Sequence, residues 1–257
     1  MSYVTTVLAD APDHFWRMAD PGGYLAHDIG AAPTPLWAAS AAATLGYSGP
    51  NSDGGSALAL PNPVQYFQTI AAIQHAASFS VELWVWTSGV YGGAAFFLMG
   101  WDGASANGPF IQLQANNKLA ANQNGVAALD PAVLTFNAWH HIVVTYANGG
   151  NLILYKDAVN VGQVACPAVG AQTLNFLLGR RSGAGNLAEA AFSEVAAYPA
   201  VLTPARVTAH FVAADNVASR PVIQTPAVYN NSTGGVTQSP QEIADIRAAV
   251  IRTFPTT

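Results

Sequence analysis

The stretch WHHIVVTY at residues 139–146, followed by ANGGN at 147–151 and LILYK at 152–156, decides the fold of this chain. Both apolar segments are rich in β-branched and aromatic residues, which favour strands. The turn between them is short and contains two glycines, as in the loops of β-hairpins. The stretch therefore predicts two antiparallel strands joined by a tight turn.

A second strand signal comes from FSVELWVWT at residues 79–87, where side chains alternate between two faces. Further strands are expected at 110–114, 175–179 and 190–198, between segments rich in glycine and proline. Short strands separated by glycine- and proline-rich turns predict an antiparallel sandwich or barrel. The alternation assigns Phe79, Val81, Leu83 and Val85 to one face of residues 79–86, and Ser80, Glu82, Trp84 and Trp86 to the other.

Helical signals are few, and most lie near the C-terminus. Residues 3–12 suit one short helical turn, and Thr203-Pro204 suits the start of a helix that continues to about Ala214, because Thr is a good N-cap and Pro fits the first turn. A polar arm then leads to the capping box SPQE at 239–242. The helix predicted after it has one apolar stripe, which must be buried either on its own domain or on a neighbouring subunit. The stripe consists of Ile243, Ile246, Val250 and Phe254.

Three blocks, in this order, resemble the laminin G-like and concanavalin A-like jelly-roll domains: residues 79–85, the hairpin at 139–157, and FSEVAAY with LTP at 192–204. Two positions depart from the family pattern, since Ser193 stands where Asp is usual and Ala158 where Gly is usual. The resemblance implies an all-β, two-sheet antiparallel jelly-roll sandwich, which we assign to residues 1–218. The extended arm and amphipathic helix predicted above then occupy residues 219–257. The opening of the chain is similar to the start of such domains in bacteriophage and bacterial surface proteins.

The composition excludes several classes of partner. Only 9% of the residues are charged, and the net charge is −5 with two lysines and seven arginines. Without a basic run, the chain offers no electrostatic footprint for nucleic acid or for an anionic membrane surface. We expect no secretion signal, and the sequence has no apolar run of about 18 residues that could span a bilayer. The single Cys166 excludes an intrachain disulfide and is interpreted as a buried, idle thiol.

The sequence gives little support for catalysis or for a metal. Glycoside hydrolysis needs two carboxylates across one cleft, and the four glutamates do not form the Glu-x-Asp-x-x-Glu pattern of jelly-roll glucanases. Adjacent residues of a strand face opposite ways, so His140 and His141 cannot easily hold one ion. No cofactor is expected. A rim calcium ion is conceivable, but the aspartates in glycine-rich loops are interpreted as turn formers: Asp20, Asp28, Asp53 and Asp102.

One ligand site is specific enough to name. Aromatic faces bind the apolar side of a sugar, and amides bind its hydroxyl groups. Trp84 and Trp86 with Gln112 and Gln114 could share one sheet face and bind a glycan. The alternative, which we favour for the two tryptophans, is burial under a loop or a partner.

Together these features predict a non-enzymatic structural or decoration protein of a bacteriophage virion, on the capsid or tail. A virion protein is assembled in the host cytoplasm without a secretion signal and is then exposed on the particle. Its expected partners are other virion proteins and further copies of itself. Two alternatives stay open: a carbohydrate-binding adhesion module that recognises host surface glycans, and a glycoside hydrolase.

Overall fold

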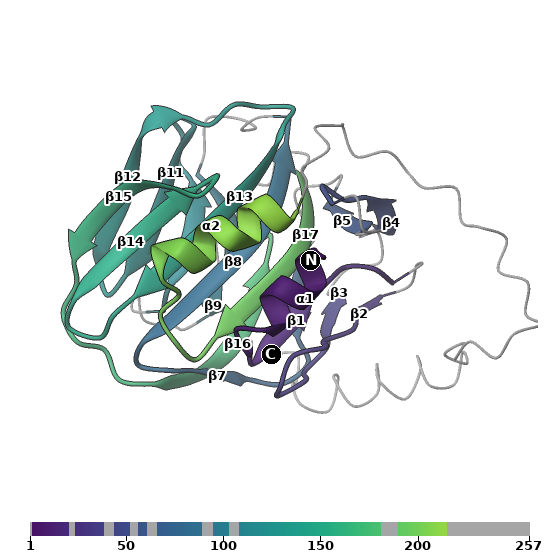
Figure 1. Cartoon of the computed structure of the whole chain (residues 1–257), viewed down its shortest axis with the longest axis horizontal. Coiled ribbons are helices and arrows are strands. Elements are labelled where there is room, and N and C mark those ends of the chain that lie inside the picture. Colours follow the sequence, from purple (N-terminus) through teal and green to yellow (C-terminus); the bar gives the residue numbers. More distant parts are fainter. Residues whose placement is uncertain are drawn as a thin grey trace, which may run out of the picture. The chain divides into compact units, whose positions relative to one another are not determined.

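Two antiparallel β-sheets lie face to face in the computed structural model of the chain (Figure 1). The structure describes residues 2–20, 24–38, 44–51, 56–60, 66–88, 95–102, 108–180 and 190–214. The predicted all-β, two-sheet sandwich is confirmed. The predicted arm and C-terminal helix lie outside the described residues, together with Ile243, Ile246, Val250 and Phe254.

The first sheet has eight strands in the order β15-β14-β13-β8-β17-β5-β4, with β1 paired to β17. Its centre is made by β8 and β13, which pair along their whole lengths from Trp139 opposite Trp86 to Tyr146 opposite Phe79. Its strands are β1 (His14–Trp16), β4 (Thr44–Ser48), β5 (Ser56–Leu60), β8 (Phe79–Thr87), β13 (Trp139–Tyr146), β14 (Asn151–Lys156), β15 (Val159–Ala165) and β17 (Ala190–Tyr198).

The second sheet has nine strands in the order β12-β11-β10-β9-β16-β6-β3-β2, with β7 paired to β16. Neighbours in this sheet come from distant parts of the sequence, since β16 lies between β9 and β6. Its strands are β2 (Leu25–Ala26), β3 (Leu36–Ala38), β6 (Phe67–Thr69), β7 (Ile73–His75), β9 (Phe96–Asp102), β10 (Phe110–Leu113), β11 (Lys118–Gln123), β12 (Val126–Val133) and β16 (Gln172–Leu178).

The hairpin predicted from the sequence is β13–β14. Val144 lies opposite Leu154, and Tyr146 lies opposite Leu152. The turn closes with a hydrogen bond from the Gly150 amide to the Ala147 carbonyl, 2.7 Å. Gly149 has a φ of 71°, a backbone conformation that glycine adopts without steric cost. The prediction of two strands joined by a glycine turn is confirmed.

The apolar side chains form two separate layers. The first layer lies between the sheets and contains the inward side chains of β8, among them Leu83 and Val85. The second lies outside the eight-stranded sheet and contains the opposite side chains of the same strand, Trp84 and Trp86. The alternation predicted for residues 79–86 is therefore confirmed, and both of its faces are buried.

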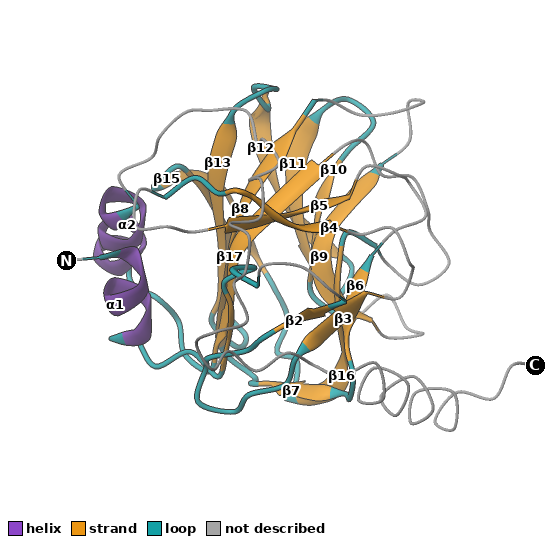
Figure 2. Cartoon of the chain, turned by 90° about the vertical axis from the view of Figure 1, so that its right-hand side faces the viewer, coloured by secondary structure: helices purple, strands orange, loops and turns teal. Residues whose placement is uncertain are grey.

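Two helices, α1 (Tyr3–Leu8) and α2 (Pro204–Ala213), cover the second apolar layer (Figure 2). Ser2 caps α1, because its hydroxyl accepts from the Thr5 amide. Thr203 caps α2 in the same way, with Pro204 in the first turn, as the sequence predicts. In the described part of the chain, neither helix is long and apolar enough to cross a membrane.

Candidate functional site

The two tryptophans of the predicted glycan site lie inside the protein. Trp84 has no exposed surface and Trp86 has 2%. The Trp84 ring stacks on His141 at 5.0 Å between centroids and on Phe211 of α2 at 5.9 Å, while Tyr3 of α1 meets it edge-on at 6.5 Å. The helices occupy the space that a sugar would need, so burial is the correct alternative for this pair.

The two glutamines of the predicted site lie elsewhere. Gln112 is on β10 in the nine-stranded sheet, and Gln114 follows the same strand. Both are half-buried and face away from the core, because Ile111 and Leu113 between and beside them fill it. The prediction that Trp84, Trp86, Gln112 and Gln114 share a face is therefore wrong. Alternation fixes the face of one strand and does not reveal which sheet that strand joins.

The outer face of the nine-stranded sheet brings Gln112 together with aromatic residues that the sequence reasoning missed. The strand register aligns one continuous row of residues across seven strands: Trp37, Gln68, Leu177, Gly100, Phe110, Asn122 and Ala127. The next row contains Phe97 opposite Gln112. We call the half-buried aromatic and amide residues of these rows the aromatic–amide face: Trp37, Gln68, Phe97, Phe110, Gln112 and Asn122.

Close packing shapes this face around Gly100. A Cβ atom at Gly100 would lie 2.5 Å from the Phe110 Cβ, so only glycine allows Phe110 to sit across that strand. The Phe110 ring then lies 5.4 Å from the Phe97 ring, in a tilted arrangement. A register shift between Ile111 and Gln112 sets Phe97 opposite Gln112. Two phenyl rings and an amide thus lie side by side.

Hydrogen-bonding capacity remains on this face. The Trp37 indole nitrogen and the Asn122 amide nitrogen have no hydrogen-bond partner among the described residues. Each is a donor, and an unused covered donor costs free energy relative to one in a hydrogen bond. The face therefore combines stacking surfaces with one indole donor and one amide donor that have no partner among the described residues.

One cation flanks the aromatic–amide face. The Arg180 guanidinium lies over the Tyr66 ring, 4.8 Å from its centroid. Tyr66 directly precedes Phe67, whose side chain is in the core, so the alternation directs Tyr66 outward. The Gly179 amide donates to the Leu98 carbonyl, 2.7 Å, which brings Arg180 to the level of Phe97 on the neighbouring strand.

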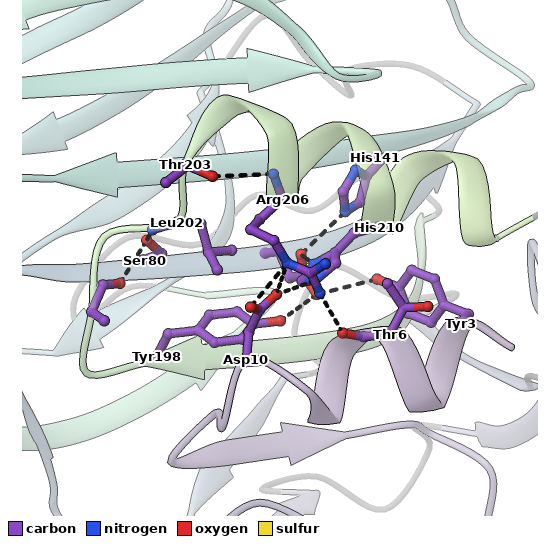
Figure 3. A network of polar contacts seen from close by, with 12 residues as sticks. Tyr3, Thr6, Asp10, Ser80, His141, Tyr198, Leu202, Thr203, Arg206 and His210 are labelled. Atoms are coloured by element: carbon purple, nitrogen blue, oxygen red, sulfur yellow. Dashed lines mark hydrogen bonds and ion pairs between the residues drawn. The ribbon is translucent and has the colours of Figure 1, made fainter. Parts of the chain in front are cut away.

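A network of buried charges lies on the opposite side of the molecule, under α1 and α2 (Figure 3). Glu82 is fully buried at its centre. The hydroxyl of Tyr198 donates to Glu82 Oε1 at 2.7 Å, that of Tyr3 at 3.3 Å, and His210 Nδ1 donates to Oε2 at 2.8 Å. His141 Nε2 is 3.4 Å from Oε2, beyond an ordinary hydrogen bond, so its contribution is electrostatic.

The network continues from His210 to the ends of both helices. His210 Nε2 donates to Asp10 Oδ2 at 2.7 Å, and the Arg206 Nε lies 2.7 Å from the same oxygen. Arg206 also donates to the Thr6 carbonyl of α1 at 3.0 Å. The imidazole bridges two carboxylates, which requires a proton on each nitrogen. These contacts tie α1 and α2 to each other and to β8.

The directions of the pKa shifts agree with a protonated His210 that bridges Glu82 and Asp10. Burial alone would raise the pKa of Glu82, but the charge and hydrogen bond of His210, together with the electrostatic contribution of His141, outweigh burial and hold that pKa well below its usual range. Burial alone would lower the pKa of His210. The negative charges and hydrogen bonds of Glu82 and Asp10 outweigh burial and raise that pKa. Burial and the charge of Glu82 raise the pKa of Tyr3 and Tyr198, so both hydroxyls stay donors.

The described glutamates are poorly placed for hydrolysis. Glu82 and Glu194 are both fully buried, and Glu194 is held by Arg17 with an N···O distance of 2.9 Å. A general acid or base must reach a substrate in a cleft, and these buried carboxylates cannot do so. Glu189 and Glu242 lie outside the described residues.

The loop aspartates act within their own turns. Asp28 accepts hydrogen bonds from His14 and from the amides of Phe15, Gly30 and Thr34, at 2.7–2.8 Å. Asp20 binds both the ring and the amide of His27. In the described part of the chain no three His, Cys, Asp or Glu side chains cluster as metal ligands. Asp53, and the side chain of Asp102, lie outside what the structure describes.

The thiol and the paired histidines have structural surroundings. Cys166 is 3% exposed, and burial raises the pKa of its thiol, so the interpretation as a buried thiol is confirmed. His140 and His141 face opposite sides of β13, as predicted. His140 binds Asp157 at 2.7 Å, and His141 packs against Trp84.

Comparison with protein families agrees with this architecture. The laminin G-type family model described as "Concanavalin A-like lectin/glucanases superfamily" matches residues 52–208, which is more than half of the chain. The chain belongs to the concanavalin A-like lectin/glucanase superfamily. A search of the curated proteins found no match.

Solved structures with a similar jelly roll are distant in sequence. A Trypanosoma rangeli sialidase in complex with 2,3-difluorosialic acid superposes with a TM-score of 0.62 at 14% identity, covering 80% of this chain and 33% of that one. The binding domain of botulinum neurotoxin serotype D gives 0.59 at 10% identity, covering 79% and 51%. The type G receptor-binding domain gives 0.55 at 10%, covering 78% and 51%. The chain thus spans about a third to a half of these proteins, and identities this low establish the fold alone.

Proposed function

We propose that this protein binds carbohydrate through the aromatic–amide face of its nine-stranded sheet. The observation that carries the proposal is that the strand register places aromatic rings and amides side by side on this face, with Phe97, Phe110 and Gln112 as immediate neighbours. Phenyl and indole rings bind the apolar faces of sugar rings, and amides can both donate to and accept from hydroxyl groups. A shallow sheet face of this kind suits a chain of sugars.

The two faces of the sandwich differ in a way that supports this assignment. Helices α1 and α2 cover the outer face of the eight-stranded sheet, whereas neither of them packs on the aromatic–amide face (Figure 2). The residues of that face keep partial exposure, as a binding surface must. The buried positions of Glu82 and Glu194 support binding without hydrolysis.

Glycan-array screening of the whole protein, followed by titration calorimetry on the best ligand, tests the proposal. Phe110→Ala should weaken binding about tenfold, because it removes one stacking surface of the central row. Val212→Ala is the matched control, since Val212 is 69% exposed on α2 and lies on the covered side of the sandwich. Circular dichroism must show that both variants are folded. Absence of any glycan ligand, or unchanged affinity in folded Phe110→Ala, would contradict the proposal.

A second candidate is a structural or decoration protein of a bacteriophage capsid or tail, with other virion proteins and copies of itself as partners. Low charge favours it, because a surface with few charges is poorly protected against association. So do exposed apolar residues on the edge strands β12 and β15: Leu129 at 49%, Val133 at 54% and Val159 at 61%. Sedimentation with and without residues 219–257 tests it. A monomer in both forms, with no binding to virions, would exclude this role.

A further inference from the structure

Arg180 differs from most other described cations in its surroundings. Of the five lysines and arginines in the described ranges, three pair with carboxylates: Arg17 with Glu194, Lys156 with Asp130, and Arg206 with Asp10. Arg180 and Lys118 have no carboxylate partner among the described residues. Both lie on the outer side of the nine-stranded sheet, next to the aromatic–amide face.

The geometry holds the Arg180 head group in place. Its guanidinium lies 4.8 Å from the centroid of the Tyr66 ring. A guanidinium stacked on a ring keeps its N–H groups free along its edge, in the planar fork that matches a carboxylate with two hydrogen bonds. Stacking also reduces the side-chain freedom that binding would otherwise remove. The Arg180 guanidinium is thus pre-organised to bind a planar anion such as a carboxylate.

Strand β16, which leads to Arg180, and its neighbour β6 carry no charged residue, and the other neighbour β9 carries only Asp102, whose side chain lies outside what the structure describes. The only charged residues of β10, β11 and β12 are Lys118 and Asp130. Asp130 points to the other sheet, where its carboxylate lies 2.5 Å from the ammonium of Lys156. Lys118 on β11 is three strands from Arg180, about 14 Å at the usual strand spacing. Among the described side chains, neither Arg180 nor Lys118 is therefore neutralised by a carboxylate.

We propose that the glycan bound here is acidic, with a carboxylate-bearing sugar whose carboxylate is received by Arg180 beside the aromatic–amide face. This inference rests on the proposed function, because it names the class of sugar that the same face takes. The sugar ring stacks on the Phe97–Phe110 pair, and Arg180, at the level of Phe97, binds the carboxylate. Lys118 lies farther along the face and would attract a second acidic unit of an extended chain.

Matched pairs of probes that differ in the carboxylate test the inference: 3′-sialyllactose against lactose, and tri-galacturonate against galactotriose. Calorimetry on the wild-type protein should favour one acidic probe over its neutral partner by about tenfold, as expected for one charge-assisted contact. This preference should shrink as salt is added. The pair that responds distinguishes a sialic acid from a uronic acid.

Two substitutions separate the charge from the shape of the head group. Arg180→Gln should abolish the preference for the acidic probe, and Arg180→Lys should retain only part of it, because an ammonium cannot form the planar fork. Lys118→Gln should reduce affinity only for the longer acidic probe. If neither the acidic nor the neutral probes bind, and the array is also empty, the proposed function itself fails. If Phe110→Ala weakens binding while Arg180→Gln leaves the acidic preference unchanged, carbohydrate binding stands and the role of Arg180 is refuted.

Discussion

Replacing Glu82 by glutamine should destabilise the protein strongly although the two side chains have the same shape. Glu82 is fully buried and accepts hydrogen bonds from Tyr198 and His210 at 2.7 and 2.8 Å. Glutamine can still accept from a tyrosine hydroxyl, but it removes the negative charge that balances the protonated His210. A buried charge that has lost one partner is costly because the other is left uncompensated away from water.

The expected loss is about 3 kcal/mol, at the lower end of the ~3–5 kcal/mol measured when one partner of a buried pair is removed. Asp10 remains as a second carboxylate on His210, which justifies the lower value. For a domain of this size, about 3 kcal/mol corresponds to a fall in Tm of about 6–12 °C. The loss should be largest near pH 6 and smaller at higher pH, because a neutral His210 no longer needs the charge.

Urea unfolding at pH 6 and pH 8.5, followed by tryptophan fluorescence, measures this change. Trp84 reports on the relevant layer, since it packs against His141 and Phe211. Val212→Ala on the exposed side of α2 is the control, with an expected change within about 0.5 kcal/mol. A Glu82→Gln protein within about 0.5 kcal/mol of the wild type at pH 6 would refute the role of the charged bridge.

Three further predictions follow from the same packing. The stability of the wild type should be greatest between about pH 4.5 and 6.5. The raised pKa of His210 contributes stability that is lost as the pH rises through that pKa, and the lowered pKa of Glu82 contributes stability that is lost as the pH falls through that pKa. The Tm should therefore decline on both sides of this window, and His210→Gln should flatten the decline at alkaline pH. Gly162→Ala should cost about 1–3 kcal/mol in urea unfolding, because the new Cβ would lie 2.4 Å from the Leu129 carbonyl oxygen, and an unchanged midpoint would contradict the contact between β12 and β15. Trp84→Ala should lower stability by about 3–5 kcal/mol, and glycan affinity of the fraction that stays folded should equal that of the wild type.

Local sequence patterns were sufficient to predict the longer central strands, such as β8, β13 and β17, since the signals lie within a few residues of one another. Alternation over residues 79–86 correctly separates Leu83, which packs between the sheets, from Trp84, which does not. The N-cap Thr203 and the hairpin at residues 139–156 are likewise where the sequence predicts them. Strand β1 ends at Trp16, because the backbone at Met18, with a φ of 59°, leaves the extended region.

Long-range arrangement explains what local patterns missed. The cover over Trp84 comes from α1 and α2, and the hydrogen bond from His210 to Glu82 joins residues 128 positions apart. The aromatic–amide face is likewise assembled from five strands that lie between residues 36 and 123. One signal was present, because Trp37 lies between two core residues, Leu36 and Ala38, and must therefore face outward. Its strand is only three residues long, too short for a pattern to be evident.

The buried charges also bear on which face can bind a ligand. To expose Trp84 to a sugar, α2 would have to leave the sheet, and that movement would break the contacts of His210 with Glu82 and Asp10. Each of these charge-assisted hydrogen bonds contributes roughly 1.5–3 kcal/mol, and the apolar layer beneath the helix would be lost as well. A ligand on that side would need to offset the whole cost before any net affinity remained. The aromatic–amide face requires no displacement of either helix, so the network that closes one side of the sandwich is consistent with the binding that we propose for the other.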